Sequence, residues 1–234
     1  MESLNIVSLE LLSSSEPPGT PNNTWSHARF LTEILPSLAA QTPVRNGSKS
    51  ALLLELQNPE FVSRNSTHAH LTTSCIVVHP NATHVLLLHH RKIQEWVYPG
   101  GHADGDWYLL RSALRECTEE TGLRQVRLLP AFPQQPLLPF FVQHFFLKPF
   151  GDTPAHEHYD AVFAFQALTS EVVFDEAESA GIRWVPVEQL KAQVQQDLEM
   201  QDGISFLTAD VCLSVLHQAE CKPHAEGNAL QADR

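Results

Sequence analysis

The stretch that decides the fold is residues 98–123, YPGGHADGDWYLLRSALRECTEETGL. Its two adjacent glycines, Gly100 and Gly101, allow unusual backbone angles and a close approach to a ligand. A polar turn follows, and residues 108–121 then have a helical pattern that ends at Gly122, a residue type common just beyond a helix. These residues therefore predict a glycine turn that leads into a helix.

The predicted helix has one acidic face and one apolar face. Successive helical residues turn by about 100°, so the spacing i, i+3 and i+4 places Glu116, Glu119 and Glu120 on the same side. The other side gathers apolar residues, namely Leu110, Ala113, Leu114 and Cys117. We expect the apolar face to hold the helix against a sheet, and the acidic face to look into a cleft or into solvent.

Three neighbouring carboxylates repel one another unless a positive charge lies among them. Oxygen ligands suit Mg²⁺, which usually also contacts substrate phosphates. For three acids alone, a solvated helix face is the commoner explanation. The glycine turn directly before the helix, together with Arg115 beside Glu116, favours a metal site instead.

From Gly101 onward the stretch resembles the Nudix box, whose pattern is G-x5-E-x7-R-E-U-x-E-E-x-G-U, with U a bulky apolar residue. Arg115, the three glutamates and Gly122 match this pattern, and Cys117 stands at the first U. The resemblance extends over roughly residues 60–190, through FVSR at 61–64, HLTTS at 70–74, HHRK at 89–92, His144, HEHYD at 156–160 and IRWVPVEQL at 182–190. It implies an α/β protein with the Nudix α/β/α sandwich, built on a mixed sheet.

Trp107 is the one departure from the box, because it stands where the family has a glutamate. In the family, that glutamate is understood to brace the loop against the box arginine. We expect Asp106 or Asp104 to pair with Arg115 instead. Replacing Trp107 by Glu should then change the rate only slightly, whereas removing the substitute aspartate should lower it.

The resemblance implies hydrolysis of a diphosphate linkage in a nucleoside diphosphate-linked compound or nucleotide, by attack of water on phosphorus. It assigns Mg²⁺ or Mn²⁺ to the carboxylates of Glu116, Glu119 and Glu120 and the carbonyl of Gly101. The bound ion makes its water more acidic while a carboxylate takes the proton. That base is either Glu116 or a glutamate outside the box, with Glu178 the best candidate and Glu176 behind it. Arg115 completes the expected catalytic set.

The chain has 13 histidines. Three of them are expected to donate hydrogen bonds to substrate phosphate or sugar: His102, His144 and His158. The spacing of His68 with His70, and of His156 with His158, would suit two-histidine ligand pairs on strands. No third ligand has an obvious spacing, so zinc receives little weight.

The remaining segments fit the same fold. Apolar or alternating runs predict strands at 71–79, 84–90, 124–129, 139–147, 159–167 and 182–185. Helices are predicted at 4–12, at 25–40 and from Val187 onward, and a short helix or strand at 51–56. We divide the chain into an N-terminal helical extension at 1–60, a Nudix domain at 61–220 and a loose C-terminal tail at 221–234.

Composition narrows the range of partners. A net charge of −12 argues against binding a nucleic acid polymer or an anionic membrane, since both need clusters of Lys and Arg. No apolar run approaches the ~20 residues of a membrane span, and the N-terminus lacks a secretion signal, so we expect a cytoplasmic protein.

The four cysteines lack CxxC spacing and are expected to be reduced thiols. The implied partner is a small nucleoside diphosphate derivative, and the sequence predicts no oligomeric state.

Two functions remain open at this point. The first is an active diphosphatase, and the alternative is a catalytically degenerate Nudix-fold module that binds a nucleotide or has a regulatory role. Trp107 is the only support for the alternative. Retention of all three glutamates favours the enzyme, because only metal binding and catalysis require them together. Substrate identity depends on pocket contacts that a single sequence does not assemble.

Overall fold

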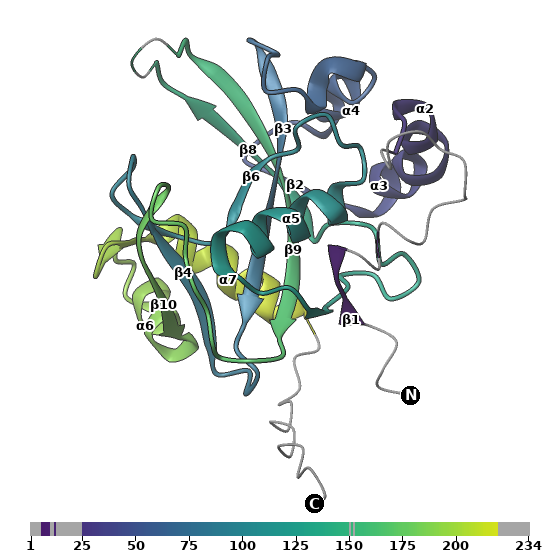
Figure 1. Ribbon diagram of the computed structural model, residues 1–234. Helices are drawn as coiled ribbons and strands as arrows, with labels where there is room; N and C mark the ends of the chain where they lie inside the picture. Colours follow the sequence, from purple (N-terminus) through teal and green to yellow (C-terminus); the bar gives the residue numbers. More distant parts are fainter. Residues whose placement is uncertain (1–5, 10–11, 13–24, 150, 152, 220–234) are drawn as a thin grey trace, which may run out of the picture.

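The residues described by the computed structural model are 6–9, 12, 25–149, 151 and 153–219 (Figure 1). They have the expected α/β architecture, in which helices cover both faces of a mixed sheet. The strands are β1 (Ile6–Val7), β2 (Val44–Arg45), β3 (Ala69–Val78), β4 (His84–His90), β5 (Trp96–Val97), β6 (Gly100–His102), β7 (Val126–Leu128), β8 (Phe141–Leu147), β9 (His156–Ala167), β10 (Ser179–Pro186), β11 (Met200–Gln201) and β12 (Ile204–Ser205). The helices are α2 (His27–Arg29), the π-helix η2 (Phe30–Ile34), α3 (Leu35–Gln41), α4 (Lys49–Glu55), the short 3-10 helix η3 (Pro59–Val62), α5 (Leu109–Thr121), α6 (Val187–Gln195) and α7 (Phe206–Gln218).

The long strands β3 and β9 form the centre of the sheet. They pair in parallel over their whole common length, from Ala69 opposite Glu157 to Val78 opposite Gln166. The short strand β6 pairs with β3 in the antiparallel sense, with His102 opposite Thr72. Every residue of β3 is buried, because helices cover both faces of the sheet, and the buried residues include four polar ones, His70, Thr72, Thr73 and Ser74.

Alternate residues of these two strands contribute to two separate hydrophobic cores. Cys75 and Phe163 lie in the core that contains the apolar side of α5. Ile76 and Val162 lie in the other core, with α7. Since successive strand residues point to opposite faces, the parity of a residue number decides which helix layer its side chain meets.

Helix α5 follows the prediction closely. It ends at Gly122, which has a left-handed φ of 72° and donates its N–H to the carbonyl of Thr118. Leu110, Ala113 and Cys117 are buried against the sheet, as the pattern predicted. In Figure 1 the helix lies across one face of the sheet, with α7 on the other face.

The N-terminal region matches the prediction only in part. The helix expected at 25–40 is present as the continuous run of α2, η2 and α3. The helix expected at 4–12 is wrong for Ile6–Val7, which forms strand β1 and pairs with β7. The backbone hydrogen bonds offered by this neighbouring strand are a tertiary effect that the local pattern does not contain. The division of the chain at residue 60 stays a prediction, and the tail predicted at 221–234 lies outside the described residues.

Helix α7 was not predicted, although the helix starting at Val187 is confirmed as α6. The buried residues Thr208, Val211, Cys212 and Val215 lie on one side of α7, but apolar residues such as Leu207 and Leu213 stand at less buried positions on the other side. A helix of this kind lacks the clear polar and apolar sides that a sequence pattern reveals. Within the described part of the chain, no helix is both long and apolar enough to cross a membrane.

Candidate active site

The glycine turn and the acidic face of α5 meet directly. The backbone N–H of Gly100 donates to a carboxylate oxygen of Glu120 at 2.8 Å. A side chain on Gly101 would collide with Glu116, because its Cβ would lie 2.6 Å from the carboxylate of that residue. Neither glycine has a positive φ, so close approach, rather than an unusual backbone angle, is what requires Gly101.

The three glutamates are not equivalent. Glu116 and Glu120 are buried, with 8% and 7% exposure, while Glu119 is exposed. Burial raises the pKa of Glu116 to about 7, and the nearby charges of Glu119 and Glu178 add to the shift. Burial also raises the pKa of Glu120 to about 8, with further contributions from Glu116 and Glu178. Two of the three carboxylates on the acidic face are therefore buried in the protein.

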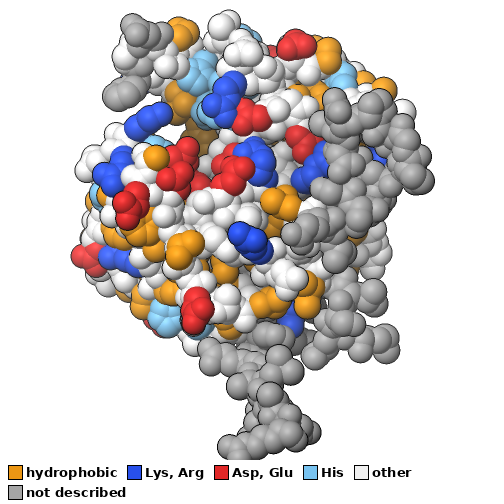
Figure 2. Space-filling view, in the orientation of Figure 1, with side chains coloured by type: hydrophobic (Ala, Val, Ile, Leu, Met, Phe, Trp, Pro, Cys, Tyr) orange, Lys and Arg blue, Asp and Glu red, His pale blue; other side chains and the backbone are white. Residues whose placement is uncertain are grey.

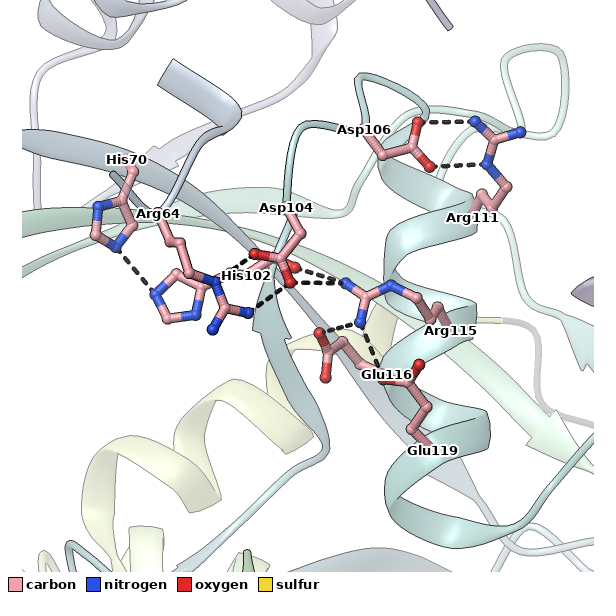
Figure 3. Close-up of polar contacts among 9 residues, drawn as sticks. All are labelled: Arg64, His70, His102, Asp104, Asp106, Arg111, Arg115, Glu116 and Glu119. Atoms are coloured by element: carbon pink, nitrogen blue, oxygen red, sulfur yellow. Dashed lines mark hydrogen bonds and ion pairs between the residues drawn. The ribbon is translucent and has the colours of Figure 1, made fainter. Parts of the chain in front are cut away.

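Arg115 connects α5 to the glycine turn. Its guanidinium lies 2.8 Å from Glu116 and 3.0 Å from Glu119, and it donates to the backbone carbonyl of His102 at 2.7 Å (Figure 3). Figure 2 shows acidic and basic side chains lying next to one another on this face of the molecule, beside a hollow. Arg115 thus holds two of the candidate metal ligands in place.

The prediction that Asp106 or Asp104 pairs with Arg115, in place of the missing box glutamate, is matched only in part. Asp106 does not contact Arg115; it pairs with Arg111 at 2.7 and 2.9 Å and accepts the N–H of Tyr108, just before α5. Asp104 lies 3.8 Å from Arg115. Its main partner is Arg64, which donates two hydrogen bonds of 2.6 Å (Figure 3). These bonds lower the pKa of Asp104 below its ordinary value.

Trp107 has a packing role that the box pattern does not predict. It is 4% exposed, and its ring centroid lies 4.7 Å from that of Phe30 and 4.4 Å from that of His27. The side chain in place of the family's glutamate therefore packs on the N-terminal helices. The expectation that Trp107→Glu would have only a slight effect does not fit this burial.

The predicted outside base, Glu178, lies in the turn before β10. Its backbone N–H and carbonyl bond to Asp175 and Arg91. Its negative charge raises the pKa of both Glu116 and Glu120. The backbone carbonyl of Glu176 accepts a hydrogen bond from the Arg91 side chain. The choice of Glu178 over Glu176 as the base stays a prediction.

The three histidines predicted to contact substrate are divided between the two faces of the sheet. His144 lies opposite Tyr159 and contacts Glu157 at 2.9 Å, on the α5 side. His102 and His158 lie on the α7 side, where burial lowers the pKa of His102 to about 4 and that of His158 to about 3. These two imidazoles are therefore neutral at pH 7, and His144 belongs to a different environment.

The sequence did not single out a buried polar group beside these histidines. Asp160 of β9 accepts hydrogen bonds from the hydroxyls of Thr72, at 3.0 Å, and Ser74, at 2.9 Å. Burial raises the pKa of Asp160 to about 6. The only available sequence signal was that His158 and Asp160 stand at alternate positions of β9, whose second half is mostly apolar. Arg64 was also missed, because its partner Asp104 is 40 residues away in sequence.

The donor set on α5 fits a hard divalent cation. Glu116 and Glu120 are carboxylates held in a buried, mutually repulsive environment, and a nearby cation would relieve both penalties. Glu119, on the same helix face, is exposed and pairs with Arg115 at 3.0 Å. The assignment of Mg²⁺ or Mn²⁺ to Glu116, Glu119 and Glu120 stays a prediction.

Comparison with known proteins gives consistent results. The family model for the NUDIX domain matches residues 68–203. A NUDIX family hydrolase from Clostridium perfringens is 22% identical, with a TM-score of 0.47, covering 63% of this chain and 96% of the other. The NUDIX domain of Shewanella oneidensis NrtR, in complex with ADP ribose, is 16% identical, with a TM-score of 0.40 and coverage of 63% and 86%. A C. elegans Ap4A hydrolase is 16% identical, with a TM-score of 0.38 and coverage of 63% and 93%.

Proposed function

Because this chain belongs to the NUDIX family, we propose that it is a metal-dependent hydrolase that cleaves a diphosphate linkage in a nucleoside diphosphate-linked compound or nucleotide. The observation that carries the proposal is the junction of Gly100 and Gly101 with the carboxylates of Glu116 and Glu120. Such an arrangement supplies oxygen donors at a turn that a phosphate can approach closely.

In this proposal Glu116, Glu119 and Glu120 hold Mg²⁺ or Mn²⁺, with the carbonyl of Gly101 as a further ligand. The bound ion would neutralise charge on the phosphate oxygens and make the attacking water more acidic. Arg115 is a positioning residue, because it binds Glu116 and Glu119 and the turn at the same time. Its contacts set the angle between α5 and β6.

The attacking water must lose a proton, and two groups are suited to accept it. Glu116 has a pKa raised to about 7, which is close to the value at which a general base works best near neutral pH. Glu178 adds negative charge at the same place from a separate loop. We propose Glu178 as the base when Glu116 is occupied with the metal. The predicted role of His102 and His158 as substrate donors stays a prediction.

The proposal is tested by incubating the full chain with nucleoside diphosphate sugars, ADP-ribose, dinucleotides and modified nucleoside triphosphates. Phosphate or nucleoside monophosphate release is measured with Mg²⁺, with Mn²⁺ and with excess chelator. We expect turnover of at least one compound class with metal and its loss with chelator. Tight nucleotide binding without turnover would instead establish the degenerate module, and undiminished turnover in chelator would exclude the metal-dependent mechanism.

A further inference from the structure

Four histidines from three different strands meet on the α7 side of the sheet. We call His70 of β3, His102 of β6, and His156 and His158 of β9 the histidine cluster. His70 lies directly opposite His158 in the parallel ladder, and the ring centroids of the pairs in contact are 4.5–5.5 Å apart. One nitrogen from each of His70, His156 and His158 can be chosen so that all three lie within 4.8 Å of one another.

We propose that the histidine cluster binds a divalent transition metal, with zinc as the expected ion, at a site separate from the glutamates of α5. Imidazole nitrogens select Zn²⁺, Ni²⁺ or Cu²⁺ over Mg²⁺, which prefers oxygen. The sequence showed the pair His156 and His158 but no third ligand with local spacing. The pairing of β9 with β3, and of β3 with β6, supplies two more.

Two nitrogen–nitrogen contacts in the cluster are close to the edge length of a tetrahedral zinc site. The Nε2 atoms of His70 and His102 are 3.1 Å apart, and those of His156 and His158 are 3.0 Å apart (Figure 3 shows the first pair). With Zn–N bonds of about 2.0–2.1 Å, tetrahedral geometry places neighbouring ligand nitrogens about 3.4 Å apart. Shifts of a few tenths of an ångström would therefore convert each contact into an edge of a zinc tetrahedron.

The other ring nitrogens of two members are already held by backbone carbonyls. The Nδ1 atom of His70 lies 3.0 Å from the carbonyl of Ser66, and that of His156 lies 2.9 Å from the carbonyl of Pro154. A carbonyl only accepts, so each Nδ1 carries the proton and each Nε2 of the neutral ring presents a lone pair. Metal-binding histidines are typically oriented in this way by a second hydrogen bond.

The positive charge of Arg64 does not strongly oppose metal binding at the histidine cluster. Arg64 acts on His70 and His102 electrostatically. However, its guanidinium is bound by both carboxylate oxygens of Asp104, which offsets most of its charge. The cluster thus consists of buried or half-buried imidazoles beside a neutralised ion pair.

A metal in the histidine cluster would also hold the glycine turn in place. Gly101 faces Glu116 on the α5 side, while the next residue, His102, turns to the histidine cluster on the α7 side. A metal bound to His102 would therefore fasten β6, and with it the glycine turn, to β3 and β9. This clamp would not require any change in the carboxylates that form the proposed active site.

Zinc binding is tested on the full chain after removal of metals by chelation. Zn²⁺ is titrated in competition with a chromogenic chelator, and Co²⁺ is titrated as a spectroscopic probe of tetrahedral nitrogen ligation. We expect one equivalent of Zn²⁺ per chain and visible Co²⁺ absorption bands. The double variant His156→Ala/His158→Ala should lose at least about 100-fold in zinc affinity, and so should the more conservative His70→Gln.

Two controls separate this proposal from misfolding and from the proposed function. His68→Ala removes a histidine with a 75% exposed side chain, two residues from His70, and should bind zinc like the wild type. Glu120→Gln should keep zinc binding even where hydrolysis is lost. Absence of stoichiometric zinc in the wild type, or unchanged affinity in folded His70→Gln, would overturn the site. Either result would leave two histidine–histidine hydrogen bonds as the role of the cluster.

Discussion

The carboxylate of Glu116 occupies the space that a side chain of Gly101 would need. One turn further along α5, Glu120 accepts the N–H of Gly100. Individual atoms therefore decide this site, because one added methyl group would move a candidate metal ligand. The same sensitivity makes single substitutions at this site informative.

Glu120→Gln should abolish most turnover and leave the fold intact. The amide keeps the shape and one oxygen that can accept the Gly100 N–H, but it loses the charge needed to bind a cation. Turnover and thermal unfolding are measured side by side, with Glu188→Gln on exposed α6 as the control. Wild-type turnover in Glu120→Gln would contradict the assigned role.

Asp104→Ala should mainly slow turnover, whereas Asp106→Ala should mainly lower stability. Loss of Asp104 releases Arg64 and removes a charge 3.8 Å from Arg115, so we expect roughly tenfold slower turnover with little loss of stability. Loss of Asp106 removes the two hydrogen bonds that it accepts from the Arg111 side chain, which is 9% exposed, and should cost about 1.5–3 kcal/mol of unfolding free energy. Denaturant titrations and rates on both variants check this, and the reverse pattern would refute the assignment.

Asp160→Asn should change how stability depends on pH. The pKa of Asp160 is about 6 in the folded protein against 3.8 ordinarily, so its proton favours folding below the lower value, and this contribution is lost as pH rises through 6. Asparagine can still accept from Thr72 and Ser74 and does not titrate. The stability of the variant relative to the wild type should therefore be about 1 kcal/mol greater at pH 7 than at pH 5. Equal differences at both pH values would show that Asp160 does not titrate in this range.

Helix α5 and the loop before it contact two separate parts of the protein. The glutamates at the C-terminal end of α5 contact the glycine turn, while Trp107, just before its N-terminus, packs on α2 and η2. The departure from the box pattern therefore has a structural cause. A glutamate at this position would be placed against aromatic rings rather than against Arg115.

Trp107→Glu should be strongly destabilising. Removing a buried tryptophan typically costs about 3–5 kcal/mol, and a carboxylate without a partner at this place adds a desolvation penalty. Trp107→Phe, which keeps an aromatic ring near Phe30, should cost much less. Denaturant unfolding of the two variants measures the difference. If Trp107→Glu were as stable as the wild type and more active, the packing role would be wrong and the degenerate module would regain support.

The N-terminal helices share a hydrophobic core with the rest of the chain. Trp25, Phe30 and Leu52 belong to the same buried cluster as the apolar side of α5 and alternate residues of β3 and β9. Burial of one large apolar side chain is worth roughly 1.5–3 kcal/mol, so several together exceed what a domain of this size can easily lose. The sheet and its N-terminal helices therefore stabilise one another.

A chain that begins at residue 61 should be much less stable than the full protein. It would expose Trp107 and the α5 side of the core that residues 25–56 now cover. Circular dichroism and thermal unfolding of the shortened chain are compared with those of the full chain. An unchanged unfolding midpoint would mean that residues 1–60 are an independent extension, as their sequence alone suggested.

The sequence determined the features that depend on local pattern. The helical spacing of Glu116, Glu119 and Glu120, the stop at Gly122 and the strand runs all identified their elements, because helix and strand periods are written directly into the order of residues. The same stretch carried the likeness to the Nudix box. Helix α7 was not predicted, because apolar residues stand on its less buried side as well as on its buried side, so it has no clear polar stripe.

Only the tertiary structure decided the contacts between residues distant in sequence. The pairing of Asp104 with Arg64, the packing of Trp107 on Phe30 and the assembly of the histidine cluster each join segments more than 25 residues apart. The strand order places β3 between β6 and β9, and no local period specifies that order. It follows from burying both faces of the sheet at once, a property of the folded chain and not of any single segment.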